Sequence, residues 1–244
     1  MTNASIGKTF DFNTIGQDFI KDPFPTCKAL REYSPMHRNS DGSLFLTRYS
    51  DVLRVYRDPL MSSDKKIAFR KKFGETPLYK HHTSSLVFND PPYHTVVRKL
   101  LSAGFTPRKL AEMEPLIIKI VNGLLDRLED LSEFDLVKEY AMALPTEIIS
   151  FMLGIPVEHR HKLRQYSLNI LGALDPVVSQ QRLDEGNFSV EEFGEVLSQI
   201  IDRRRSEQTS KSDGEILMSL ILGDVNGRRL TNTELIQNCI FLLN

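Results

Sequence analysis

The sequence of 244 residues is poor in the features that mark several specialised classes of protein. It has only two cysteines, Cys27 and Cys239, and we interpret both as small buried hydrophobic residues. The amino terminus has no apolar run of the signal-peptide kind, and no segment reaches the roughly 18 apolar residues of a membrane span. A formal net charge of -1 gives no bulk attraction to nucleic acid or a membrane surface. We expect a cytoplasmic protein with reduced thiols and no nucleic-acid or membrane partner.

The composition that remains, 41% hydrophobic and 26% charged, is that of an ordinary soluble domain. A β-hairpin is predicted near the front, where residues 35–38 and 43–47 flank the turn-rich segment 39–42. Elsewhere the apolar spacing is mainly helical, and we find no internal repeat. The fold class is therefore mainly α with a small β-hairpin near the front.

Helix boundaries follow from cap residues, prolines and glycines. The segments predicted to be helical are 23–33, 51–57, 91–103, 107–131, 145–154, 156–172, 189–205, 214–222 and 231–244. Residues 134–137 predict a short strand, and residues 173–188 a polar connection.

Residues 60–89 have poor periodicity and predict a long loop with about one helical turn inside it. Its paired histidines, His81 and His82, have no partnered cysteine or aspartate cluster. We expect both to be solvated, and we assign no metal site to the chain.

The segment 88–110, FNDPPYHTVVRKLLSAGFTPRKL, contains the most informative pair of residues. Asp90 and Pro91 are a suitable N-cap and first residue for a helix from about 91 to 103. His94 and Arg98 then lie one turn apart on one face, where they can share an anionic partner. Two carboxylates or a phosphate would fit such a pair. A solvated surface pair with no ligand is the alternative from spacing alone.

This segment resembles the C helix and the start of the D helix of bacterial cytochrome P-450s, in its Asp-Pro-Pro-x-His-Thr-x-x-Arg run and the following Gly-Phe-Thr-Pro-Arg. The resemblance implies that His94 and Arg98 bind the propionates of haem. Other segments match the family in order, including the hairpin, the F–G region at 173–188 and the start of the I helix at 241–244. One departure is Val96 or Val97, where the family often has a second arginine.

In the family, a haem with a cysteine thiolate ligand takes electrons from a redox partner and transfers one oxygen atom from dioxygen to a small organic substrate. The resemblance thus implies haem as cofactor and an electron-transfer partner. It also suggests that Leu86, Val87 and Phe88 line the substrate pocket. The identity of the substrate does not follow from these residues.

Neither the family's cysteine-ligand loop, Phe-x-x-Gly-x-x-x-Cys-x-Gly, nor its Glu-x-x-Arg pattern occurs in the sequence. We therefore expect residues 1–244 to be a truncated cytochrome P-450 domain that ends inside the I helix, lacks the haem-ligand region and is inactive alone. No catalytic residue is assigned. The apolar helix at 231–244 is expected to leave an exposed patch, since no later segment covers it.

Two other interpretations stay open. The chain could be half of a split monooxygenase that another, carboxy-terminal chain completes. It could also be a non-catalytic helical module that binds anions through a basic patch formed by His94, Arg98, Lys99, Arg108 and Lys109.

Overall fold

The structure is a computed structural model that describes residues 9–207 and 216–244. The chain forms two compact units, each described by itself. The first unit contains the described residues up to Ser62 together with Leu174–Ser179, and the second contains Ser63–Ala173 and the described residues from Gln180 onward. Among the described residues, no helix combines the length and the apolar character that crossing a membrane requires.

The first unit contains short helices and the predicted hairpin. Strand β1, Met36–Arg38, pairs antiparallel with β2, Leu44–Leu46, and Gly42 takes a positive φ of 84° in the turn between them. The helical elements of this unit are η1 (Phe12–Thr14), α2 (Gln17–Lys21), α3 (Phe24–Tyr33) and α4 (Tyr49–Arg57). The hairpin and the helices predicted at 23–33 and 51–57 are confirmed, the last with a start two residues earlier.

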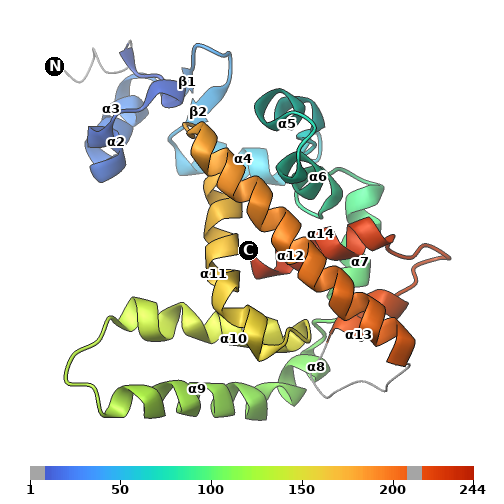
Figure 1. Cartoon of the computed structure of the whole chain (residues 1–244). Helices are drawn as coiled ribbons and strands as arrows, with labels where there is room; N and C mark the ends of the chain where they lie inside the picture. The colour runs from blue at the N-terminus through green and yellow to red at the C-terminus, as the bar shows by residue number, and fades with distance from the viewer. Residues whose placement is uncertain (1–8, 208–215) are drawn as a thin grey trace. The chain divides into compact units, whose positions relative to one another are not determined.

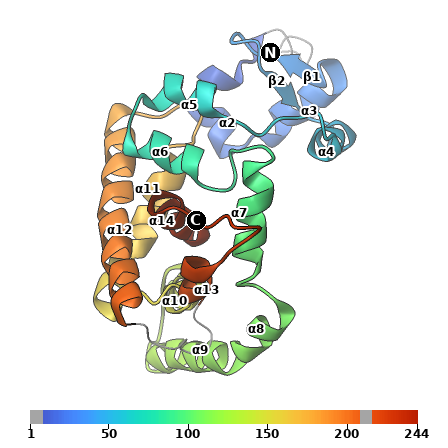
Figure 2. The same ribbon diagram turned by 90° about the vertical axis from the view of Figure 1, so that its right-hand side faces the viewer.

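The second unit is built of helices around an apolar core (Figures 1 and 2). They are α5 (Lys66–Phe73), α6 (Pro77–Ser84), α7 (Tyr93–Ser102), α8 (Pro107–Glu112), α9 (Glu114–Glu129), η2 (Val137–Ala141), α10 (Ala143–Met152), α11 (Val157–Gly172), α12 (Gln180–Glu207), α13 (Leu217–Leu222) and α14 (Asn232–Leu243). Helix α11 packs along α12, while α14 contacts α6, α10 and α12. The start predicted for α13, Gly214, lies outside the described residues.

The long loop predicted at 60–89 is wrong, because this stretch contains α5 and α6. The start of α6 has a recognisable signal: the Thr76 hydroxyl accepts a hydrogen bond from the Tyr79 amide, and Pro77 stands in the first turn. Gly74, with a φ of +67°, ends α5. The two helices are short, and their apolar residues are too few to give a clear helical period.

Two predictions on 107–141 are also wrong. The single helix predicted at 107–131 divides at Met113 into α8 and α9, since Pro115 suits the first turn of a new helix and lacks the amide that a continuous helix needs. The predicted strand at 134–137 is instead the approach to η2, a π-helix. The described residues contain no strand that pairs with it, so its alternating pattern has no sheet to join.

Helices α10 and α11 follow the predicted prolines closely, although α10 begins two residues before Pro145. Helix α12 begins at Gln180, nine residues before the predicted start. Ser189 is therefore no N-cap: it is fully buried, its hydroxyl donates to the Glu185 carbonyl at 2.7 Å, and it accepts from Asn169. A serine bonded four residues back is compatible with a helix interior.

The helix α14 confirms one prediction and corrects another. The capping box is present, with Thr231 and Glu234 satisfying each other's backbone amides. The expected exposure is wrong for Leu235, Cys239 and Ile240, which are each at most 1% exposed. Ile236, Phe241, Leu242 and Leu243 of the same helix are partly exposed. Helices α6, α10 and α12 of the same unit contact α14, and its buried residues belong to the core.

Candidate functional site

The candidate site lies on α7, which begins two residues later than predicted. Its N-cap is Pro92, with the carbonyl of Asp90 accepting from the His94 amide at 3.1 Å. The Asp90 carboxylate does not cap α7, because it accepts a hydrogen bond from the Ser63 amide at 2.8 Å. The predicted N-cap at Asp90 and helix start at Pro91 are therefore wrong by two residues.

Helix α7 presents two distinct faces. Val97, Leu100 and Leu101 are buried, with exposures of 0%, 3% and 4%, and they attach the helix to the core. His94 is half-buried and Arg98 is exposed, so this pair lies at the border between the packed face and solvent. The structure therefore brings the two predicted residues one turn apart on an accessible edge of a well-anchored helix.

The two side chains have no competing protein partner. Within residues 9–207 and 216–244, neither His94 nor Arg98 donates a side-chain hydrogen bond or forms an ion pair. Two other basic residues of the segment 88–110 do have protein partners. Arg108 pairs with Glu112 at 3.0 Å, and Lys109 donates to the Ala103 carbonyl and the Ser219 hydroxyl. An arginine and a histidine left in this state are suited to a carboxylate or phosphate ligand.

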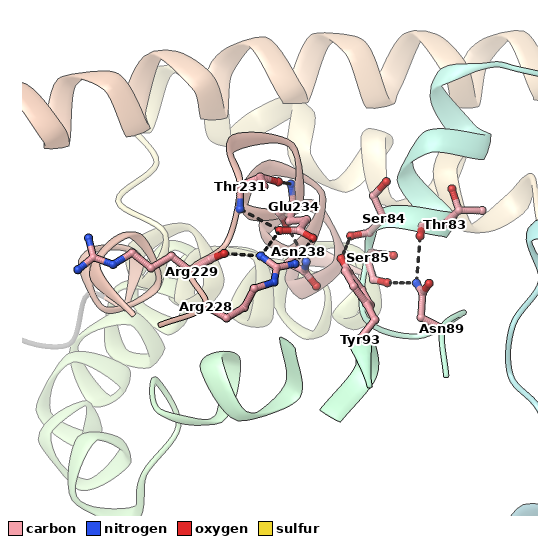
Figure 3. A network of polar contacts seen from close by, with 10 residues as sticks. All are labelled: Thr83, Ser84, Ser85, Asn89, Tyr93, Arg228, Arg229, Thr231, Glu234 and Asn238. Carbon is pink, nitrogen blue, oxygen red and sulfur yellow. Dashed lines mark hydrogen bonds and ion pairs between the residues drawn. The ribbon is translucent and has the colours of Figure 1, made fainter. Parts of the chain in front are cut away.

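Polar contacts hold the segment before α7 in place (Figure 3). The Asn89 amide, 4% exposed, donates to the carbonyls of Thr83 and Ser85 at 3.1 and 2.7 Å. Its carbonyl oxygen accepts from Lys66 at 2.9 Å. The segment between α6 and α7 is thus fixed by side chains as well as by its own backbone.

A second group of contacts surrounds Tyr93, which lies between the end of α6 and α14 (Figure 3). The Tyr93 hydroxyl donates to the Ser84 carbonyl at 2.6 Å. Burial, followed by the charge of Glu234, raises the pKa of Tyr93 to about 12, and hydrogen bonding from Asn238 opposes part of this rise. Tyr93 therefore stays protonated and remains a hydrogen-bond donor.

Glu234 lies at the centre of the contacts on the α14 side. Both of its carboxylate oxygens accept from the Arg228 guanidinium, at 2.6 and 3.0 Å, and one also accepts from the Thr231 amide at 2.8 Å. Although burial acts in the opposite direction, these hydrogen bonds lower the pKa of Glu234. Asn238 continues the network by donating to the Glu234 carbonyl at 2.7 Å, and its own oxygen is buried without a partner.

The residues predicted to line a substrate pocket lie between α6 and α7. Leu86 is 7% exposed, Val87 is 42% exposed, and the Phe88 ring packs edge-on against Phe69 at 4.8 Å. A groove of about 930 Å³ lies elsewhere, between α6, α12 and α14, and is lined by residues such as Tyr79, Glu195 and Gln237. It shares no residue with segment 86–88 or with the His94–Arg98 pair. The pocket assignment of 86–88 therefore stays a prediction.

The expectation that His81 and His82 are solvated is wrong. They are 2% and 3% exposed, because they belong to α6 and face the core. Nδ1 of His81 contacts Oε1 of Gln237 at 3.0 Å, while His82 is surrounded by the rings of Phe69, Phe73 and Phe88. Burial lowers the pKa of His81 to about 4 and that of His82 to about 3, so both are neutral at pH 7. No group of three or more His, Cys, Asp or Glu side chains within the described ranges is placed to hold a metal ion.

The two cysteines do not have the surroundings of a haem ligand. Cys239 is fully buried in α14, and burial raises the pKa of its thiol to about 12. Cys27 is half-buried in α3 of the first unit, and both thiols are free. An axial thiolate needs an accessible, deprotonated sulfur held by hydrogen bonds. Among the described residues, His94 and Arg98 therefore offer donors that suit the carboxylates of a ligand, while the thiol of Cys239 is buried with a raised pKa.

Sequence reasoning missed the residues that support the site, namely Tyr93, Asn238 and Arg228. Two of them lie next to residues that the sequence did indicate. Tyr93 precedes His94, and Arg228 pairs with Glu234 of the predicted capping box. Nothing in the sequence shows that these elements meet, because the contacts join segments about 150 residues apart.

Comparisons with known proteins give a consistent result, although no family model matches the chain. The sequence is 33% identical over 233 residues to vitamin D(3) 25-hydroxylase of Pseudonocardia autotrophica, covering 92% of this chain and 54% of that protein. It is 31% identical over 244 residues to the cytochrome P-450 monooxygenase PikC of Streptomyces venezuelae, covering 96% of this chain and 54% of PikC.

The structure is similar to that of PksS, a cytochrome P-450 of the bacillaene polyketide synthase of Bacillus subtilis 168. The TM-score is 0.76 at 25% identity, covering 96% of this chain and 57% of PksS. The chain therefore spans about half the length of the curated relatives that it matches.

Proposed function

Since this chain matches the amino-terminal portion of bacterial cytochrome P-450s in sequence and in fold, we propose that it is the amino-terminal part of a haem-thiolate monooxygenase of a small organic substrate. In this proposal His94 and Arg98 bind the two propionates of the haem. The observation that supports it is the pair itself: two donors one turn apart, on an anchored helix, with no protein partner among the described residues.

Each side chain has a defined role in the proposed site. The planar guanidinium of Arg98 gives charge-assisted hydrogen bonds to one carboxylate, and an imidazole N–H of His94 donates to the other. The buried residues of α7 hold the helix in place, so binding orders only two side chains. When bound, a thiolate-ligated haem supplies the activation of dioxygen.

The axial ligand, we propose, comes from outside residues 1–244, because neither Cys27 nor Cys239 has the setting of a thiolate ligand. It would belong to a further segment of the polypeptide or to a complementing chain. Without it, we expect these 244 residues alone to have no monooxygenase activity. Cytoplasmic location and an electron-transfer partner are part of the same proposal.

The alternative of a general anion-binding module has less support. Of the five basic residues assigned to that patch, Arg108 is paired with Glu112 and Lys109 is bonded to α13. The remaining patch is small. It consists of Lys99 and the His94–Arg98 pair, and two carboxylates on one ligand match the pair better than a dispersed charge.

Binding of haemin, compared with binding of its dimethyl ester, tests the proposed clamp. The ester has the same ring and iron but no free carboxylates, so the ratio of the two affinities measures the propionate contacts. His94→Ala and Arg98→Ala should each lower this ratio about tenfold, the effect of one charge-assisted hydrogen bond.

Matched controls are available on other helices. His159→Ala on α11 and Arg108→Ala on α8 remove the same side-chain types from other helices, and we expect an unchanged ratio. If His94→Ala and Arg98→Ala also leave the ratio unchanged, the clamp proposal is wrong.

The absorbance spectrum of the haemin-loaded chain, reduced and exposed to carbon monoxide, tests the axial-ligand proposal. We expect a spectrum without the thiolate-type Soret band. Appearance of that band, and its loss in Cys27→Ser or Cys239→Ser, would show that a cysteine of these 244 residues reaches the iron.

A further inference from the structure

Tyr93 occupies the point where three elements of the second unit meet. It is the first residue of α7, and its hydroxyl donates to the carbonyl of Ser84, the last residue of α6, at 2.6 Å. On its other side it faces α14, where Glu234 and Asn238 influence its pKa. Figure 3 shows this ring between the end of α6 and the side chains of α14.

The contacts on the α14 side are themselves firmly held. Glu234 is fixed by the capping box and by the bidentate Arg228 contact, and Asn238 is fully buried with its amide on the Glu234 carbonyl. The side chains beside Tyr93 on α14 are therefore held by their own hydrogen bonds, and the Tyr93 hydroxyl is held on the Ser84 carbonyl. A hydrogen bond between fixed groups restrains the helix that carries it.

His94 is the next residue, so the orientation of the first turn of α7 determines where its imidazole points. The backbone dihedrals of that turn also orient Arg98, one turn later. The prolines before Tyr93 donate no amide hydrogen bond, and the N-cap Pro92 supplies no side-chain cap to α7. The side chain of Tyr93 is therefore a direct restraint on the start of this helix.

We propose that Tyr93 is a positioning residue of the haem-propionate clamp: its hydroxyl, held on the Ser84 carbonyl beside Glu234 and Asn238, sets the direction in which His94 and Arg98 face the ligand. This inference rests on the proposed function, since it concerns the same site. Tyr93 itself does not touch the ligand in this arrangement.

The test uses Tyr93→Phe in the full chain, with haemin and haemin dimethyl ester as probes. The ring and its packing remain, and only the hydroxyl is lost. We expect the haemin-to-ester affinity ratio to fall about fivefold, which corresponds to one hydrogen bond, while affinity for the ester stays unchanged. A merely structural role would change both affinities together.

Tyr166→Phe is the matched control. Tyr166 is a buried tyrosine of α11, 6% exposed, and its ring stacks on Phe193 of α12. It should leave the ratio unchanged. Asn238→Ser examines the same restraint from α14, should Tyr93→Phe fail to give a cooperative melt, and a lowered ratio is again expected.

The outcomes separate the inference from the proposed function. If His94→Ala and Arg98→Ala lower the ratio but Tyr93→Phe does not, the clamp stands and the positioning role is wrong. An equal loss of affinity for both probes in Tyr93→Phe also overturns the positioning role. If no variant at 94 or 98 changes the ratio, the proposed function itself fails.

Discussion

Two neighbouring helices carry pairs of basic side chains that have opposite surroundings. On α6, His81 and His82 are almost completely buried, one bonded to Gln237 and the other surrounded by phenylalanine rings. On α7, His94 and Arg98 lie at the edge of the packed face without protein partners in the described residues. His81, His82 and His94 have the same side chain, so the difference in their exposure comes from packing alone.

The difference shows how a fold decides which basic groups are available for binding. Desolvation makes the charged form of an imidazole unfavourable, and burial therefore keeps His81 and His82 neutral. A neutral, enclosed imidazole contributes packing and, for His81, a hydrogen bond. His94 is not enclosed in this way, and its position on the anchored face of α7 costs little side-chain freedom on binding.

The largest expected effect is acid destabilisation through the α6 pair. The pKa values of His81 and His82, about 4 and about 3 in the folded protein, lie below the unfolded value of 6.5. Unfolding therefore takes up protons below pH 6.5, and stability that is complete above this pH is lost as the pH falls to about 4 for His81 and about 3 for His82. At pH 5 the loss is about 2 kcal/mol per histidine. Urea unfolding at pH 7 and pH 5 measures it.

A double variant isolates the contribution of these two side chains. His81→Gln with His82→Phe removes both titrating groups and keeps polar and aromatic character in their places. Its stability should vary less between pH 7 and pH 5 than that of the parent chain. An equal pH dependence in both proteins would show that other groups cause the acid effect.

A smaller effect on stability is expected from the contact between His81 on α6 and Gln237 on α14. Gln237→Leu removes the acceptor of the His81 ring nitrogen and leaves this group buried without a partner. The free energy of unfolding should fall by about 1 to 3 kcal/mol. Gln165→Leu, at an exposed glutamine of α11, is the control and should change stability little. Thermal or urea unfolding of both variants measures the difference. If Gln237→Leu costs no more than Gln165→Leu, the His81–Gln237 contact does not stabilise the fold.

The boundaries of many helices could be predicted because their signals are local. Prolines 145 and 156 indicated the starts of α10 and α11, and the Thr231–Glu234 capping box indicated α14. The α5–α6 region was missed because two short helices carry too few apolar residues for a clear period. Ser189 was misread because its pattern of serine and glutamate also fits a helix interior when the hydroxyl bonds four residues back.

The candidate site divides in the same way. His94 and Arg98 could be recognised from their spacing and from the family resemblance, both of which are local. The contact of His81 with Gln237 and the position of Tyr93 beside Glu234 could not, because they depend on α14, about 150 residues further along the chain. The enclosure of His82 depends on how α5 packs against α6. The expected exposure of α14 is wrong for Leu235, Cys239 and Ile240 for a related reason, because α6, α10 and α12 pack against this helix.

The smallest expected change in stability is that of variants at the His94–Arg98 pair on α7. His94→Ala and Arg98→Ala remove no described hydrogen bond or ion pair, so each should change the free energy of unfolding by less than about 0.5 kcal/mol at pH 7. The same variants should lower the haemin-to-ester affinity ratio. Loss of binding without loss of stability is the signature of side chains kept for a ligand. Urea unfolding beside the haemin titrations measures both, and a stability loss as large as that of Gln237→Leu would place His94 or Arg98 with the structural residues of α6.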